Sequence, residues 1–125
     1  MTPEKGALIT EYASIDPQAT IAVLPVAAIE QHGPHLPLST DNTIMNGMLD
    51  AVIARMPDDL DVRILPVQSV GKSNEHVHAP GTLTLTPLAA IQSWADLGAS
   101  VARAGVKKLV VVNSHGGNEE IMGIV

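Results

Sequence analysis

Apolar runs and helically spaced apolar positions alternate along this chain. Residues 21–26, 62–67 and 107–113 are each dominated by a continuous apolar run, which is typical of buried strands. Between these runs, apolar residues recur at the three- and four-residue spacing of amphipathic helices. After the first run they are Ile44, Met48, Leu49, Val52, Ile53 and Met56. After the second run they are Leu88, Ile91, Ala95 and Val101, which we expect to face the sheet.

Local signals mark the ends of these helices. Residues 40–41 offer a cap for the first helix. Thr86 precedes Pro87 at the start of the second helix, and Gly105 suits its C-terminal cap. A third helix begins near residue 118. The pattern therefore predicts the order β-α-β-α-β-α.

Helices between continuous apolar strands predict a three-layer α/β/α fold, in which a mostly parallel sheet is the middle layer. Three polar loops then fall at the carboxyl ends of the strands, over residues 30–41, 68–86 and 113–118. Open α/β sheets bind ligands at that edge. We expect a functional site there.

The chain reads as a single α/β domain over residues 1–125, yet it stops inside the third helical pattern. A sheet of three strands would expose apolar edges, which native proteins avoid. We therefore expect the N-terminal half of a longer, here truncated, domain, or a chain that needs a partner. Self-association is the corresponding expectation.

Composition narrows the classes of function. The formal charge is −6, and the chain has one Trp, one Tyr, no Phe and no Cys. A nucleic-acid surface, disulfides and thiolate metal sites are therefore excluded. The first residues lack the basic and apolar regions of a signal peptide, and no apolar stretch approaches the ~20 residues of a membrane span. We expect a cytoplasmic protein without a membrane partner.

The loop after the first strand carries the densest chemistry. Within a dozen residues it gathers Glu30, His32, His35 and Asp41, a mixture of oxygen and imidazole ligands that divalent metals bind. Glycine and prolines between them exclude one regular helix, so the ligands must converge through an irregular loop. As simpler alternatives, His35 is a solvated loop residue and Asp41 a helix cap.

A matching segment follows the third strand. His115 lies between Asn113 and two glycines, Gly116 and Gly117, which allow the backbone to approach an ion closely. Together the two segments predict a metal centre. A weaker alternative is that the loops bind a small anion at helix starts without metal.

At these motifs the sequence resembles the creatininase (creatinine amidohydrolase) family. Three ordered blocks carry the resemblance: residues 24–41 with Glu-Gln-His-Gly, residues 73–83 with Ser-Asn-Glu-His and Pro-Gly-Thr-Leu, and residues 113–118. The family implies an α/β fold and two divalent ions, zinc or manganese with iron possible. It also implies cleavage of a non-peptide or cyclic amide C–N bond, and a homo-oligomer, a hexamer built from dimers.

The resemblance also implies roles for individual residues. Glu30 and His115 match ligands of one metal, His32 matches a ligand of the other, and Asp41 matches the carboxylate that bridges them. The family places substrate-binding residues in the second block. The candidates there are Ser73, Glu75 and His76, with His78 nearby, and a loop merely ordered by its Pro-Gly turn is the alternative.

Two departures from the family pattern matter. Creatininase proper has a Glu two residues after the His that matches His115, and Gly117 stands at that place here. The family's later His-Ala-Gly and Glu-Thr-Ser region, which supplies a catalytic His and a further Glu, is absent. The catalytic acid is therefore not identified in this chain.

These observations favour a metal-dependent amidohydrolase that acts on a small-molecule amide, such as a creatinine-like lactam, a formamide or a peptide-derived amide. The alternative is a truncated, inactive metal-binding domain that needs a C-terminal segment or a partner for turnover. By either interpretation, the 125-residue chain alone is expected to show little activity.

Overall fold

The computed structural model describes residues 2–3 and 14–125, and within them four parallel strands form one sheet. The strand order is β1-β3-β2-β4. The strands are β1 (Thr2–Pro3), β2 (Ile21–Val26), β3 (Val62–Ile64) and β4 (Lys108–Asn113). The α-helices are α2 (Thr40–Arg55), α3 (Pro87–Arg103) and α4 (Glu119–Ile124), and the 3-10 turns are η1 (Asn74–His76) and η2 (Gly116–Asn118).

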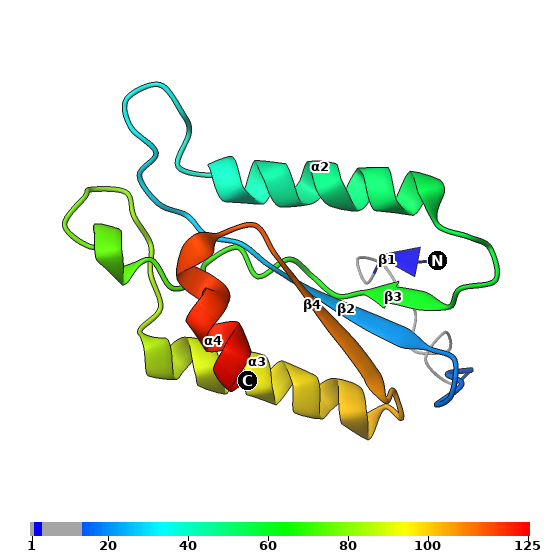
Figure 1. The fold of residues 1–125 in the computed structure, drawn as a ribbon. Helices are drawn as coiled ribbons and strands as arrows, with labels where there is room; N and C mark the ends of the chain where they lie inside the picture. Colours follow the sequence, from blue (N-terminus) through cyan, green and yellow to red (C-terminus); the bar gives the residue numbers. More distant parts are fainter. Residues whose placement is uncertain (1, 4–13) are drawn as a thin grey trace.

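The helices cover both faces of the sheet (Figure 1). α2 lies over one face, and α3 and α4 lie over the other. The predicted three-layer α/β/α architecture is confirmed. β3 ends three residues earlier than the predicted strand, and β1, at two residues, was not predicted.

The sheet is built around β2, which pairs with β3 on one side and with β4 on the other. The β2–β4 register runs from Ile21 opposite Lys108 to Val26 opposite Asn113. The carboxyl ends of β2 and β4 therefore lie side by side. This register brings the polar segment after β2 next to the one after β4.

The core lies between β2 and the helices α3 and α4. Its buried members are Leu24, Val26, Ala90, Trp94 and Ile121. Ala90 and Trp94 are four positions apart in α3, so they share one face of the helix.

The expectation that Leu88 and Ala95 face the sheet is wrong, because both are exposed, Leu88 to 79%. These two residues are seven positions apart, on a face of α3 other than the one that holds Trp94. The large indole is buried in preference to either. Ile91 and Val101 are half-buried, closer to the expectation.

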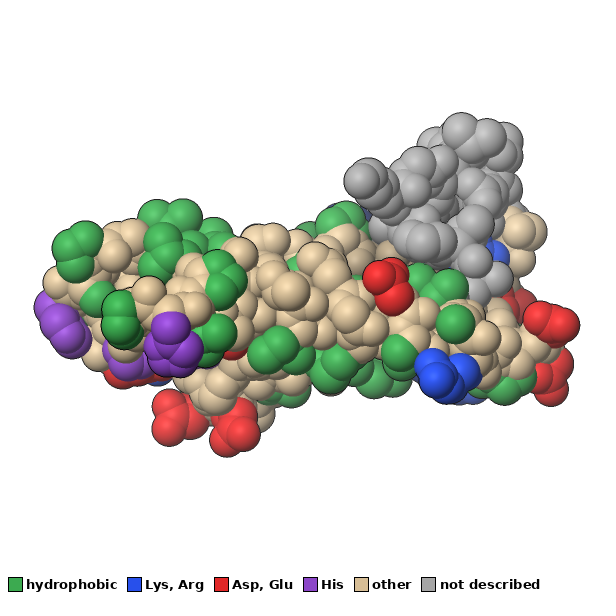
Figure 2. All heavy atoms as spheres, turned by 90° about the horizontal axis from the view of Figure 1, so that it is seen from above, with side chains coloured by type: hydrophobic (Ala, Val, Ile, Leu, Met, Phe, Trp, Pro, Cys, Tyr) green, Lys and Arg blue, Asp and Glu red, His purple; other side chains and the backbone are tan. Residues whose placement is uncertain are grey.

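The predicted apolar stripe of α2 is buried only in part, because Leu49, Ile53 and Met56 are half-buried. Ile44, Met48 and Val52 are between 43% and 49% exposed, whereas Met45 is fully buried. Apolar side chains are accordingly visible in the view from above, and histidines gather at one end of that view (Figure 2). Within the described ranges, no helix combines the length and apolar character that a bilayer crossing requires.

A polar cluster ties β2 to β3 at the end of the sheet opposite the carboxyl ends. The buried Thr20 hydroxyl donates to Asp61 Oδ2 at 2.5 Å, and Arg63 Nε donates to Asp61 Oδ1 at 2.7 Å. The hydrogen bond from Arg63, followed by that from Thr20, lowers the pKa of Asp61 below the ordinary aspartate value, against the opposing effect of burial. The carboxylate form is therefore the one that the folded chain stabilises.

We expect Asp61→Asn to lower stability at pH 7 and to matter less in acid. Because the folded pKa lies below the unfolded one, the carboxylate contributes fully above pH ~4, and its contribution is lost as the pH falls through the lowered folded value. Urea unfolding of both proteins between pH 7 and pH 3 measures this, with exposed Asp58→Asn as the control. A constant difference across that range would contradict the assignment.

Candidate metal centre

The three polar loops meet at the carboxyl ends of the strands, as expected from the sequence. Asn118, which is fully buried, joins them: its Nδ2 donates to the Ala27 carbonyl at 3.0 Å, and its Oδ1 accepts from the Lys72 N–H at 3.0 Å. The same Nδ2 also contacts Asn113 Oδ1 at 3.2 Å. One side chain therefore links the segments that follow β2, β3 and β4.

Gly71 allows this close approach. A Cβ at position 71 would collide with the Ala27 carbonyl oxygen and would lie 2.6 Å from Asn118 Oδ1. Only glycine leaves room for the loop after β3 to pass this close to the end of β2.

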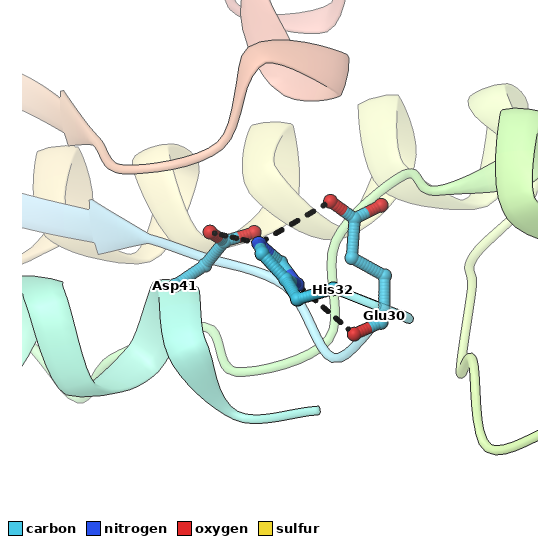
Figure 3. Close-up of side chains that lie close together, drawn as sticks. All are labelled: Glu30, His32 and Asp41. Atoms are coloured by element: carbon cyan, nitrogen blue, oxygen red, sulfur yellow. Dashed lines mark hydrogen bonds and ion pairs between the residues drawn. The ribbon is translucent and has the colours of Figure 1, made fainter. Parts of the chain in front are cut away.

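Glu30, His32 and Asp41 form one group of potential ligands (Figure 3). Glu30 and His32 lie on the segment after β2, and Asp41 lies in the first turn of α2. His32 Nε2 is 3.2 Å from Asp41 Oδ1 and 4.0 Å from Glu30 Oε1. Both carboxylates are buried, Glu30 to 6% exposure and Asp41 to 5%.

Asp41 is not the cap of α2. Ser39 stands at the N-cap position, and its side chain makes no capping hydrogen bond. The start of the helix is instead anchored by Asn42, whose Nδ2 donates to the carbonyls of Ala28 at 2.9 Å and Ser69 at 3.2 Å. This anchor turns Asp41 toward the site.

His115 reaches the same carboxylates from the segment after β4. Its Nδ1 lies 3.2 Å from Glu30 Oε1 and 3.0 Å from Asp41 Oδ2. The two oxygens of Asp41 therefore face two different histidines, His32 and His115. The structure brings all four predicted ligands together.

Backbone carbonyls determine which imidazole nitrogens carry protons. His32 Nδ1 is 3.1 Å from the Glu30 carbonyl, and His115 Nε2 is 2.9 Å from the Lys72 carbonyl. A carbonyl only accepts, so in the neutral rings these nitrogens are the donors. The other nitrogens, His32 Nε2 and His115 Nδ1, are left with lone pairs that face carboxylates.

Imidazole lone pairs that face carboxylate oxygens are the arrangement expected where a cation binds between them. Among the described residues, Glu30 Oε2 and Asp41 Oδ2 are buried without a hydrogen-bond partner, a costly arrangement unless a positive charge is present. Two ligand atoms at ~2.1 Å from one tetrahedral ion lie about 3.4 Å apart. The imidazole–carboxylate distances of 3.0–3.2 Å are close to that spacing. Carbonyl-oriented imidazoles are also typical of metal-binding histidines.

Ser73, Glu75 and His76, the predicted substrate-binding residues, lie beside this group. Ser73 is fully buried, with Oγ 3.2 Å from His115 Nε2. Glu75 Oε1 is 3.6 Å from the same nitrogen, and His76 Nε2 is 3.8 Å from Glu30 Oε2. Glu75 and His76 lie at the more exposed border of the site.

Glu75 also belongs to a second group of potential ligands. Glu30, Glu75 and His115 each offer one ligand atom, all within 4.8 Å of one another. Burial raises the pKa of Glu75. A backbone hydrogen bond and the ammonium group of Lys72, whose Nζ lies 3.3 Å from Glu75 Oε2, outweigh this effect and leave the pKa below the ordinary glutamate value. Glu75 is thus held as a carboxylate.

The position of Glu75 explains why Gly117 is a glycine. A Cβ at position 117 would overlap the Glu75 carboxylate, and it would lie 2.6 Å from both His115 Nε2 and the Lys72 carbonyl oxygen. The loop that carries Glu75 thus fills the space in which a side chain at position 117 would begin. The remaining loop histidines, His35 and His78, are exposed.

Sequence reasoning missed the residues that hold the ligands in place. Asn118 was noted only as part of the segment after β4, although its buried amide joins three loops. Gln31 stands between two predicted ligands, and its side chain contacts His76 Nδ1 at 3.1 Å. Lys72 acts on His115 through its carbonyl, for which a sequence gives no signal.

Comparisons with known proteins show which proteins this chain resembles. The sequence model of a family described as creatinine amidohydrolase matches residues 8–125. The mycofactocin precursor peptide peptidase of Mycolicibacterium smegmatis is 36% identical over 104 residues, which are 82% of this chain and 42% of that protein. The creatinine amidohydrolase of Pseudomonas putida is 30% identical over 100 residues, 76% of this chain and 37% of that protein. The chain therefore spans less than half the length of these two relatives.

Solved structures show the same fold. One described as "Creatininase Mn" has a TM-score of 0.83 at 25% identity, over 97% of this chain and 48% of that one. A mutant creatininase of the Zn-Zn type has a TM-score of 0.83 at 24% identity, with the same coverage.

Proposed function

Because the chain belongs to the creatininase family, we propose that it carries the metal centre of a hydrolase that cleaves an amide C–N bond. The observation that carries the proposal is the position of Asp41. Its Oδ1 faces His32 and its Oδ2 faces His115, at 3.2 and 3.0 Å. A carboxylate placed between two imidazoles in this way is suited to bridging two cations.

The proposed ligands divide between two divalent ions, zinc or manganese. Glu30 and His115 would hold one ion, His32 would hold the other, and Asp41 would contribute a ligand to both. Two such ions supply an activated water and polarise the amide carbonyl. The protein holds the imidazoles in the ligand tautomer through the Glu30 and Lys72 carbonyls. Glu75 and His76 border the ligands and are proposed to contact the substrate, whereas the fully buried Ser73 contacts His115 instead.

Two substrate types within the amide class are supported. A relative at 36% identity is named as a peptide peptidase and one at 30% identity as a creatinine amidohydrolase. We therefore propose either a peptide-derived amide or a small cyclic amide. The half-exposed side chains of Glu75 and His76, 40% and 34%, leave the border open to either.

A second candidate function is a non-enzymatic metal-binding domain that turns over no substrate and binds a partner through its exposed apolar surface. The exposed row on α2 (Ile44, Met48 and Val52) and the exposed Leu109 and Val110 of the edge strand β4 support this candidate. A second copy of the chain, giving a cytoplasmic homo-oligomer, is the partner we propose.

Metal and activity measurements test these proposals together. We expect the purified chain to bind zinc or manganese by elemental analysis, and binding to fall in His115→Ala. We expect little hydrolysis of creatinine, a formamide or a short peptide by the chain alone. Activity should appear when the chain is joined to the part of its Mycolicibacterium smegmatis relative that it does not match.

The outcomes separate the candidates. Absence of metal binding would overturn both functions. Metal binding with no activity in the joined protein would leave the metal-binding domain, and sedimentation that shows a monomer at high concentration would exclude the homo-oligomer. Rapid turnover by the chain alone would show that one of its own residues is the acid.

A further inference from the structure

Glu30 presents its two carboxylate oxygens to different surroundings. Oε1 faces the ligand group, 3.2 Å from His115 Nδ1. Oε2 is buried without a hydrogen-bond partner among the described residues, and His76 Nε2 lies 3.8 Å from it. His76 therefore faces the Glu30 oxygen that has no hydrogen-bond partner.

Gln31 determines which ring nitrogen of neutral His76 carries the proton. Gln31 Oε1 accepts from the Gly33 N–H at 3.0 Å, so its amide NH2 points the other way, toward His76 Nδ1 at 3.1 Å. An amide nitrogen only donates, so His76 Nδ1 accepts. The neutral ring then carries its proton on Nε2, the nitrogen that faces Glu30 Oε2.

Gln31 and His76 are both held in place by the backbone. The Gln31 N–H donates to Thr82 Oγ1 at 3.1 Å. Gly33 has a φ of 76°, a conformation that favours glycine and turns its N–H toward the Gln31 side chain. The His76 N–H donates to the Ser73 carbonyl at 3.0 Å.

We propose that Gln31 and His76 are positioning residues that orient the Glu30 carboxylate for metal binding. The inference rests on the proposed metal centre. Gln31 fixes the His76 tautomer, His76 Nε2–H approaches Oε2, and Oε1 is left for the ion. A separation of 3.8 Å is long for a hydrogen bond, and such contacts often tighten only when the site is loaded. Mutation of residues that hydrogen-bond to metal ligands typically lowers metal affinity by about 10–100-fold.

Zinc affinity, measured by chelator competition on the whole chain, tests the donor role of His76. We expect His76→Leu and Gln31→Leu to weaken zinc binding about 10–100-fold. His76→Gln keeps an N–H donor at the place of Nε2 and should retain most of the affinity. Exposed His78→Leu, two residues away, is the matched control. Wild-type affinity in His76→Leu, or an equal loss in His76→Gln, would overturn the proposal.

The tautomer is tested separately, in the metal-free protein. Imidazole ¹⁵N shifts at alkaline pH should show His76 protonated on Nε2 and hydrogen-bonded at Nδ1. The Nδ1 hydrogen bond should disappear in Gln31→Leu, and the His76→Gln spectrum assigns the signals. A proton on Nδ1 would overturn the inference whether or not zinc binds. Failure of the wild type to bind zinc would instead overturn the proposed function.

Discussion

The Asp41→Asn variant is expected to bind zinc at least roughly 100-fold more weakly than the wild type and yet to be more stable without metal. Asp41 is 5% exposed and contacts His32 and His115 through different oxygens. An amide loses the negative charge that two ions would share. In the metal-free variant, however, the amide NH2 can donate to an imidazole lone pair that faces a carboxylate oxygen in the wild type.

The two effects have opposite signs, which makes the test specific. A buried polar atom without a partner costs about 1–3 kcal/mol, so the metal-free variant should gain stability of that order. Urea unfolding in chelator and in excess zinc, at a pH that keeps the imidazoles neutral, measures both. Exposed Asp50→Asn on the same helix is the control. A metal-free variant less stable than the wild type would contradict the proposed lone-pair geometry.

The second large effect is expected for Asn118→Ala. This change removes the donor to the Ala27 carbonyl and the acceptor for the Lys72 N–H, and it leaves both backbone groups without the side chain that satisfies them. We expect the free energy of unfolding to fall by about 2–4 kcal/mol. Zinc affinity should fall as well, because the loops that carry Glu30 and His115 lose their common support.

Chemical denaturation and zinc titration of the same variant measure both consequences. Exposed Asn74→Ala, in the same loop as Lys72, is the control and should change neither quantity appreciably. A stability loss below about 1 kcal/mol in Asn118→Ala would mean that water replaces the lost hydrogen bonds. The side chain would then not be the element that joins the loops.

The positions of β2, β3 and β4, and of the helices between them, were predictable because each of these strands is a nearly continuous apolar run between polar loops. The orientation of α2 was not. Apolar residues lie on more than one side of this helix, so spacing alone does not select the row of Met45 over that of Ile44. The hydrogen bonds of Asn42 to Ala28 and Ser69 fix the rotation of the helix, and they join segments far apart in the sequence.

The composition of the candidate site was predictable for a related reason. The carboxyl ends of parallel strands lie at one edge of a sheet, so the alternation of strands and helices was enough to place the loops of Glu30, Asp41 and His115 at that edge. Which imidazole nitrogens are free to bind an ion could not be predicted, because this depends on the carbonyls of Glu30 and Lys72. Every residue has such a carbonyl, and a sequence does not distinguish the one that contacts a ring.

The β2–β4 pairing has a consequence for how the chain folds. Contacts at the site span long stretches of sequence: 73 positions separate Ser114 from Asp41, and 91 separate Asn118 from Ala27. Closing loops of this length costs chain entropy before the contacts form, which slows folding. An ion held by Glu30, Asp41 and His115 would act as a cross-link across these loops, stabilising only the chain whose last strand has already joined the sheet. Removal of the ion by a chelator should therefore loosen β4 first, although Glu30 and Asp41 lie much earlier in the chain.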